Sequence, residues 1–178
     1  ATGIVLAGGE EVRGSLVVSN ADVKRTFLKL VEERELPEPF LRRVRNFKIR
    51  GSSGKVNIAL DSMPEFPALP QDSPCLRGDL HFTDTVERME RGYDDWKAGR
   101  WSADPFLDMV IPTTLDPTMA APGKHFMSCF VQYCPPKVEG REWTDADRDA
   151  FGETVISQIA DYSPGFRDRI VHMEVRTP

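Results

Sequence analysis

The chain has 178 residues, of which 40% are hydrophobic and 29% are charged, and its formal net charge at pH 7 is −5. This length and composition are typical of one globular domain rather than a disordered chain. The negative net charge disfavours nucleic-acid binding. A basic cluster does lie between Arg42 and Arg50, but Phe47 is its only interleaved aromatic residue. No stretch of the sequence approaches the ~20 apolar residues that a membrane-spanning helix requires.

The first expected element is a β-hairpin. Residues 3–7 are rich in apolar side chains, and Gly8-Gly9 supplies a two-residue turn because glycine adopts positive φ at little cost. The returning strand is expected to run from Glu10 into the continuous apolar run at residues 16–18, which predicts a strand buried on both faces. The chain begins inside this hairpin without an initiator methionine, so we expect it to be a piece of a larger protein.

Two short helices are expected next. Residues 19–22 are expected to end the strand, and Asp22 is expected to cap the first helix, which begins at Val23. Pro37 and Pro39 end that helix and start the second. Apolar residues recur at helical spacing in both helices: Phe27, Leu30 and Val31 in the first, and Phe40, Leu41, Val44 and Phe47 in the second.

A turn, a strand and a loop follow the two helices. Gly51-Ser52-Ser53-Gly54 predicts a turn. The alternation of polar and apolar residues over 55–60 predicts a half-buried strand. Residues 63–74 are rich in proline and are expected to form an irregular surface loop, before a brief strand over residues 80–82.

A third helix is expected after that brief strand. Asp84 is predicted to cap this helix with Glu87 at the third position of a capping box, and Gly99 is predicted to end it. Helical spacing predicts an inward stripe of Val86, Met89 and Tyr93.

The second half of the chain is predicted to be mainly sheet. Residues 106–111 form a strand that Pro112 closes, and residues 115–123 form a proline-punctuated connection. Residues 125–133 are the longest strand candidate and are rich in aromatic and apolar side chains. Alternation along this strand predicts one face with Phe126, Ser128, Phe130 and Gln132, and another with Met127, Cys129, Val131 and Tyr133.

The last helix gives the clearest helical signal. Thr144 is expected to cap it, and residues 162–165 are expected to end it before a final strand over residues 170–175. The residues predicted to face inward are Ala150, Phe151, Val155, Ile156 and Ile159.

The residues by themselves show no catalytic constellation. GSSGK at residues 51–55 is similar to a phosphate-binding loop, but it lacks the upstream glycine, the Ser or Thr after the lysine, and a following helix. A plain turn is therefore favoured. Neither a GxGxxG dinucleotide fingerprint nor a GxSxG nucleophile elbow occurs in the sequence.

No metal site and no disulfide are expected. The histidines are scattered and lack helical ligand spacing: His81, His125 and His172. The cysteines are odd in number, and if Cys129 and Cys134 share a strand, their offset of five puts them on opposite faces. Reduced structural thiols are expected for these two and for Cys75, which favours a reducing compartment.

Four segments together carry a family resemblance. They are GIVLAGGEEVRGSLVVSNAD at residues 3–22, KVNIAL at 55–60, IPTTLDPTMAAPGKHFMSCFVQY at 111–133 and YSPGF at 162–166. In this order, over essentially the whole chain, the sequence resembles the phytoene-desaturase-related flavoproteins, and within them the pyridine nucleotide-disulphide oxidoreductase domain-containing branch. The most specific stretch is residues 116–123, where the family pattern more often has proline in place of Ala121.

The resemblance implies a fold and a cofactor. The fold is α+β, with a mixed, largely antiparallel β-sheet and helices packed on one face, as in the substrate domain of amine-oxidase-like flavoproteins. Residues 1–22 would be a hairpin and strand of an FAD domain, and residues 23–178 a substrate-binding domain. The whole protein would bind FAD, with contacts from Ser19, Asn20 and Ala21, whereas the chain alone is expected to bind none.

The implied function is that of an FAD-dependent, phytoene desaturase-like oxidoreductase acting on an apolar substrate. This chain would supply the substrate domain and is expected to be inactive alone. Polar groups among apolar ones orient a ligand, so the expected substrate-binding residues are Lys55, Asn57, Phe130, Gln132 and Tyr133. Two alternatives stay open: Phe130 is a core residue, and Lys55 and Gln132 simply face solvent. No residue is expected to be catalytic.

The expected partners are an apolar small molecule, the FAD-binding half of the same protein, and a second copy paired through the bare edge of the opening hairpin. We expect a cytoplasmic protein, with peripheral membrane association as the alternative. A flavin-free binding or self-associating module is a second hypothesis, driven by exposed apolar surface. An unrelated α+β enzyme is the third.

Overall fold

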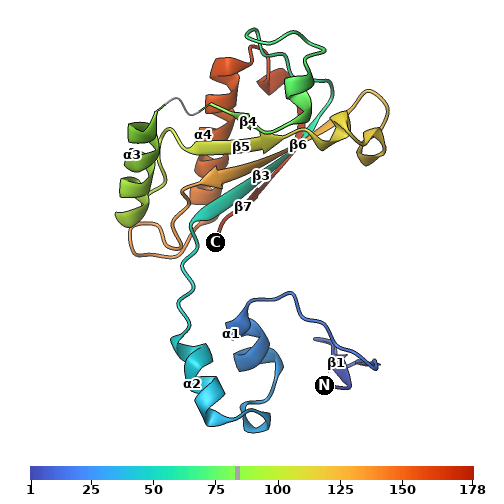
Figure 1. Ribbon diagram of the computed structural model, residues 1–178, viewed down its shortest axis with the longest axis vertical. Helices are drawn as coiled ribbons and strands as arrows, with labels where there is room; N and C mark the ends of the chain where they lie inside the picture. Colours follow the sequence, from blue (N-terminus) through green and yellow to red (C-terminus); the bar gives the residue numbers. More distant parts are fainter. Residues whose placement is uncertain (83–84) are drawn as a thin grey trace. The chain divides into compact units, whose positions relative to one another are not determined.

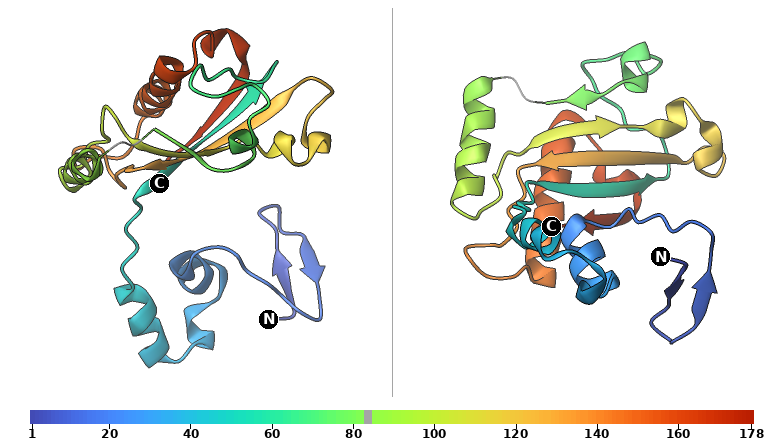
Figure 2. Two further views of the ribbon diagram at one scale, coloured as in Figure 1. Left: turned by 45° about the horizontal axis from the view of Figure 1, so that its top comes forward. Right: turned by 60° about the horizontal axis from the view of Figure 1, so that its bottom comes forward.

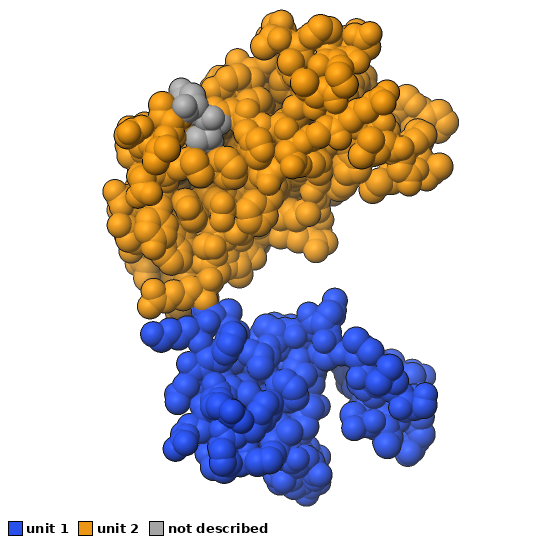
Figure 3. All heavy atoms as spheres, viewed as in Figure 1, with its two compact units in different colours: residues 1–49 blue, residues 50–178 orange. Residues whose placement is uncertain are grey.

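The computed structural model describes residues 1–82 and 85–178. The chain divides into two units, residues 1–49 and residues 50–178, which Figure 3 distinguishes by colour. The boundary that the resemblance implies follows Asp22 instead. That boundary concerns which part of a flavoprotein each segment belongs to, so it stays a prediction.

The opening hairpin of the first unit is confirmed. Strands β1 (Gly3–Val5) and β2 (Glu11–Arg13) pair antiparallel, and Gly9 in the turn has φ of 88°, a conformation that favours glycine. The predicted continuation of the second strand through residues 16–18 is wrong. Leu16 and Val18 are 78% and 81% exposed and lie outside any described strand.

Helices complete the first unit, close to where they were expected. Helix α1 (Val23–Arg25) starts at Asp22, whose carboxylate accepts hydrogen bonds from the N–H groups of Lys24 and Arg25, and it continues as a π-helical turn (Thr26–Leu30). A 3-10 turn (Glu33–Glu35) leads to α2 (Glu38–Asn46). Leu41 and Val44 of α2 are buried, whereas the expected inward residue Phe47 is exposed.

The second unit is built around one antiparallel sheet. Its strands follow the order β4-β5-β6-β3-β7, and every neighbouring pair is antiparallel (Figure 1). The bounds are β3 (Ser53–Leu60), β4 (Leu80–His81), β5 (Phe106–Val110), β6 (His125–Gln132) and β7 (Ile170–Arg176). The α+β fold with a largely antiparallel sheet is therefore confirmed.

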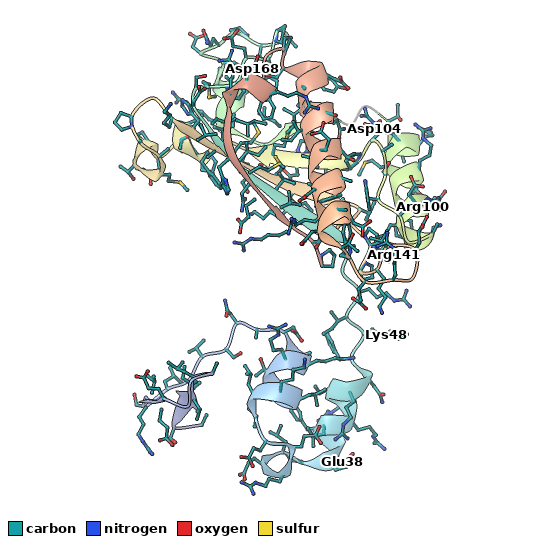
Figure 4. All side chains as sticks on the ribbon, turned by 180° about the vertical axis from the view of Figure 1, so that it is seen from behind. Glu38, Lys48, Arg100, Asp104, Arg141 and Asp168 are labelled. Carbon is teal, nitrogen blue, oxygen red and sulfur yellow. The ribbon has the colours of Figure 1, made fainter. Side chains whose placement is uncertain are left out.

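Helix α4 (Asp145–Tyr162) covers one face of this sheet (Figure 2). Thr144 caps the helix in a capping box with Asp147, as the sequence predicts for Thr144. Seen from behind in Figure 4, α4 crosses in front of the strands, with Arg141 near its start. Strands and helix share one hydrophobic core, whose fully buried members include Val56, Ile58, Leu107, Met109, Met127, Val131, Phe151, Val155 and Ile159.

The remaining segments surround that core. Residues 63–74 form a loop whose Phe66 joins the core, and 3-10 turns lie at Pro74–Arg77, Pro112–Thr114, Pro117–Met119 and Arg167–Arg169. Helix α3 (Val86–Lys97) stands at the end of the sheet where β3 begins (Figure 1). The indole N–H of Trp96 donates to the Gly51 carbonyl at 3.1 Å and so ties α3 to the start of β3.

Two predicted inward residues of α3 are exposed. Val86 is 69% exposed and Tyr93 is 38% exposed, while Gly92 is buried. The inward face is shifted around the helix because α3 packs against the sheet end rather than lying across a sheet face. The helix is capped by Thr85, which accepts from the Arg88 N–H at 3.2 Å; the predicted cap Asp84 lies outside the described residues.

Three further expectations need correction. Ala150 of α4 is exposed, because the helix presents Gly152 to the sheet instead. Cys129 and Cys134 do not share a strand: β6 ends at Gln132, and both thiols are buried in the same core rather than on opposite faces. Gly54 lies in β3, not in a turn. None of the helices that the structure describes combines the length and apolarity needed to cross a bilayer.

Candidate functional site

The side of the sheet opposite α4 is the candidate site, and we call it the open face. Gly54, Val56 and Ile58 point toward α4, so the intervening residues of β3 point the other way. Strand register then gives the open face its members: His81 of β4; Phe106, Asp108 and Val110 of β5; Phe126, Ser128, Phe130 and Gln132 of β6; Ser53, Lys55, Asn57 and Ala59 of β3; and His172, Glu174 and Arg176 of β7.

One row of side chains crosses all five strands of the open face. Directly paired residues along it are His81, Asp108, Phe130, Lys55 and Arg176. Directly opposite residues on one face have Cβ atoms about 4.5–5.5 Å apart, so neighbours in such a row are in contact range. Phe130, at the centre, is 41% exposed although it is a large aromatic residue on the middle strand. The row therefore presents an aromatic ring between an acidic and a basic side chain.

Asn57 lies in the neighbouring row, paired with Ser128 of β6 and Glu174 of β7. Its Nδ2 donates a hydrogen bond to Oε2 of Glu174 on β7 at 3.1 Å. Its Oδ1 is buried and has no hydrogen-bond partner among the described residues. Hydrogen bonds from Arg176 and then from Asn57 lower the pKa of Glu174, so this carboxylate is held ionised. A buried polar atom without a partner is costly, so Asn57 Oδ1 would gain from an added donor, but the atom is fully covered and a ligand reaches it only if neighbouring side chains move.

Four of the five expected substrate residues meet on this face. Lys55 pairs directly with Phe130, and Asn57 and Gln132 lie two residues further along β3 and β6. The alternative that Phe130 belongs to the core is wrong, because its ring is exposed on the side away from α4. Lys55 is exposed and Gln132 is half-buried. Their expected role in binding substrate stays a prediction.

Tyr133 lies apart from the other four. It follows β6, and its ring centroid is 5.3 Å from that of Tyr93 and 6.5 Å from that of Trp96, both on α3. Lys97 lies over the Tyr93 ring, 5.0 Å from its centroid, and extends the aromatic cluster. Tyr133 thus packs at the end of the sheet, and a substrate-binding role for it stays a prediction.

The expected cofactor contacts lie in the first unit. The Ser19 hydroxyl is 2.8 Å from the Thr26 hydroxyl, which also donates to the carbonyl of Ala21 at 3.3 Å. These bonds fix the chain where it enters α1. Asn20 is exposed between them, and no hydrogen bond of its side chain is found in the described part of the chain. An FAD contact at these three residues stays a prediction.

A cluster of possible metal ligands at the β4 edge of the open face escaped the sequence reasoning. Asp79, His81 and Asp108 each offer one ligand atom, and these atoms all lie within 4.8 Å of one another. Helical spacing was the wrong criterion, because two adjacent strands bring these residues together. The Asp-x-His alternation at residues 79–81, which puts both side chains on one face of a strand, is the signal that could have revealed the cluster.

A hollow lies between α3 and α4, away from the open face. Its volume is about 620 Å³, and its lining includes Arg88, Asp104, Gln158 and Tyr162. Arg88 forms an ion pair with Asp104, and both amide atoms of Gln158 are buried without a hydrogen-bond partner among the described residues. The Gln158 atoms are covered by neighbouring side chains, so the hollow is polar but offers few reachable groups.

The open face combines apolar and polar side chains. An exposed aromatic ring beside a lysine, an amide and a carboxylate suits a flat or elongated apolar molecule held by a few polar contacts. The fold and this face together define an antiparallel α+β layer that carries helices on one side and a mixed apolar and polar surface on the other.

The chain is similar in sequence to several known proteins. Over 186 aligned residues it is 33% identical to pyridine nucleotide-disulfide oxidoreductase domain-containing protein 2 of Mus musculus, in a match that covers 100% of this chain and 32% of that protein. It is 27% identical over 183 residues to the chloroplastic prolycopene isomerase of Arabidopsis thaliana, covering 100% of this chain and 28% of that protein. The resemblance that the four sequence segments carry is thereby confirmed.

Two further comparisons complete the picture. No family model matches the chain. A crystal structure of a Pyrococcus furiosus protein aligns with 98% of this chain and 34% of its own, at a TM-score of 0.48 and 14% identity. The chain spans about a third of the length of the curated relatives it matches.

Proposed function

We propose that the chain is part of an FAD-dependent oxidoreductase and that its open face holds an apolar substrate against the flavin. The observation that carries the proposal is the exposed ring of Phe130 beside the unpartnered Asn57 Oδ1, on a sheet face that α4 leaves uncovered. The homology to a protein named as an oxidoreductase and to prolycopene isomerases supports this assignment.

The residues present fit a flavin or a flavin-bound substrate. The Lys55 ammonium and the Gln132 amide offer donors on the same face. The bound flavin would accept a hydride equivalent from a C–H bond of the substrate.

The chain's own residues would bind and orient the substrate and would exclude water from it. Phe130 would stack against an apolar substrate, and the apolar side chains of Phe126 and Val110 would extend that surface along β6 and β5. Lys55 and Asn57 would set the orientation of the bound molecule through polar contacts. No residue of this face is assigned a proton-transfer role.

One observation favours a second function, that of a flavin-free binding or self-associating module. The opening hairpin exposes Ile4, Val5 and Val12, and the segment after it exposes Leu16 and Val18. Such a contiguous apolar surface is typical of an interaction site. It suits a flavin-free binding or self-associating module as well as contact with the FAD-binding part of an oxidoreductase.

The complete gene product provides the test. The protein is purified, its flavin absorbance per chain is measured, and flavin bleaching is followed anaerobically after addition of phytoene in detergent micelles, because desaturation of this polyene passes two electrons to the flavin. We expect a yellow protein whose flavin is reduced by the polyene. Phe130→Ala and Asn57→Ala should retain flavin but slow its reduction by about tenfold, the effect of losing one good substrate contact.

Leu115→Ala is the matched control, because Leu115 is an exposed apolar residue outside the open face. This variant should reduce flavin at the unsubstituted rate. A colourless full-length protein would exclude the oxidoreductase assignment. Unchanged reduction rates in both Phe130→Ala and Asn57→Ala would exclude the open face as the substrate surface.

A further inference from the structure

Three ligand-type side chains converge at the edge of the open face. His81 on β4 pairs directly with Asp108 on β5, so their side chains leave the sheet on the same side. Asp79 precedes His81 by two residues and therefore lies on that side as well. One imidazole nitrogen and two carboxylate oxygens, one from each aspartate, lie within 4.8 Å of one another.

The imidazole is held in position by its neighbour. The His81 ring stacks on the ring of Phe106, with centroids 5.3 Å apart and an interplanar angle of 18°. Phe106 lies two residues before Asp108 on the same strand and the same face. The stacking restricts how the His81 ring can turn, which keeps a nitrogen directed along the edge toward the two carboxylates.

The charges of the cluster are unbalanced. No described residue gives the side chain of Asp79, His81 or Asp108 a hydrogen bond or an ion pair. Two carboxylates at this separation repel each other, and a bound cation would turn that repulsion into attraction. By contrast, the carboxylates of Glu33 and Glu38 in the first unit are balanced by the guanidinium of Arg45, with which both form ion pairs.

We propose that Asp79, His81 and Asp108 bind a divalent transition-metal ion, with Zn²⁺ as the ion that best fits the donors. Ligands on a shared Zn²⁺ lie about 2.0–2.2 Å from the ion and hence about 3–4 Å from each other, so small side-chain rotations close the site. The imidazole favours zinc over the purely oxygen-seeking Mg²⁺. Three protein ligands leave a coordination position open to water.

Metal binding here does not require the proposed oxidoreductase function, although Asp108 pairs directly with Phe130 of the open face. The site lies at the β4 edge, and it uses neither Asn57 nor the flavin. A structural ion here would tie the two-residue strand β4 to β5, which pair through Leu80–Met109 and His81–Asp108 among the described residues. The open coordination position would also let the ion contact an anionic group of a ligand on the open face.

Zinc binding by the 178-residue chain tests the proposal. Any affinity tag is removed, and Cys75→Ser is the background in every variant because Cys75 is an exposed free thiol. Equilibrium dialysis and calorimetry with Zn²⁺ should give one ion per chain, and zinc should raise the melting temperature. His81→Ala and Asp108→Asn should each weaken binding by at least about tenfold to a hundredfold, the cost of losing even a partner that only orients a metal ligand.

His172→Ala is the matched control, because His172 is an exposed histidine on the same face at the opposite edge strand. It should bind zinc like the background. Equal losses in His81→Ala and His172→Ala would mean adventitious surface binding and would overturn the proposal, as would the absence of a bound ion at saturating Zn²⁺. Asp108→Asn preserves side-chain shape, so it remains decisive if circular dichroism shows that His81→Ala is unfolded.

Discussion

Gly54 of β3 lies directly under the ring of Phe151 on α4. A Cβ atom built on Gly54 would be 2.6 Å from both Cε1 and Cζ of that ring, and 3.3 Å from the Cys134 sulfur. The absence of a side chain at residue 54 therefore lets α4 approach the sheet. Gly152 of α4 makes a second close approach, to Val175 and Met173 of β7, so the helix packs tightly on this face of the sheet.

Gly54→Ala should destabilise the second unit. A methyl group at 2.6 Å from an aromatic ring forces the helix or the strand to move, and such overpacking costs about 1 to 3 kcal/mol in the free energy of unfolding. Chemical denaturation followed by circular dichroism measures the change. Gly78→Ala is the control, because its added Cβ would have no neighbour nearer than 3.7 Å. Equal stability of the two variants would contradict the close packing of β3 on α4.

Thr144→Ala should weaken the start of α4. The Thr144 hydroxyl accepts from the Asp147 N–H at 3.2 Å, and its loss leaves that donor unpaired, which costs about 1 kcal/mol. The melting temperature and the denaturation midpoint report the loss. Asp161→Ala, near the other end of the same helix, removes a negative charge from the helix C-terminus and should not destabilise. A Thr144→Ala protein as stable as the unsubstituted one would rule out the capping box as a stabilising feature.

The buried cysteines predict both thiol reactivity and a pH dependence. Burial raises the pKa of Cys129 and of Cys134 to about 12. A thiol-specific reagent at neutral pH should therefore label only Cys75 in the folded chain and all three thiols after denaturation. Rapid labelling of Cys129 or Cys134 in the folded state would contradict their burial.

The sign of the pH effect follows from the same shift. The folded-state pKa of these thiols lies above the ordinary value of 9.0, so the unfolded chain releases thiol protons first as the pH rises. Below pH 9.0 the two thiols add no pH dependence, and between 9.0 and about 12 they make the free energy of unfolding fall. Denaturation at a series of alkaline pH values measures this slope. Cys75→Ser should leave it unchanged.

The opening hairpin should make the isolated chain self-associate. Ile4 and Val12 are directly paired and about half exposed, and strands of three residues leave their outer edges bare. Light scattering at increasing concentration should show dimers or larger species, and Ile4→Lys or Val12→Lys should restore the monomer. A chain that stays monomeric at high concentration would argue against this edge as an interaction surface.

The sequence predicted most of the second unit because its signals are local. Alternation located β3 and divided β6 into two faces, and the structure buries the face that carries Met127, Cys129 and Val131. The side chain of Thr144 marked the start of α4. These patterns depend on strand and helix periodicity, which each segment carries in its own residues. The resemblance likewise followed from the order of four segments.

Other features were not readable from local pattern. The apolar residues 16–18 read as a buried strand, yet they are exposed because burial depends on a neighbouring strand and not on the segment itself. Gly54 read as part of a turn, but its reason for being glycine is a ring that lies 97 positions further along the sequence, at Phe151.

By itself, the sequence determined the α+β class, the main strands and helices, and four of the residues that share the open face. Only the tertiary structure decided that Phe130 is exposed, that Asn57 Oδ1 lacks a partner, and that Asp79, His81 and Asp108 meet. The physical reason is that strand register and helix docking join residues far apart in the chain. Side-chain identity fixes which face a residue belongs to, whereas pairing decides what lies beside it.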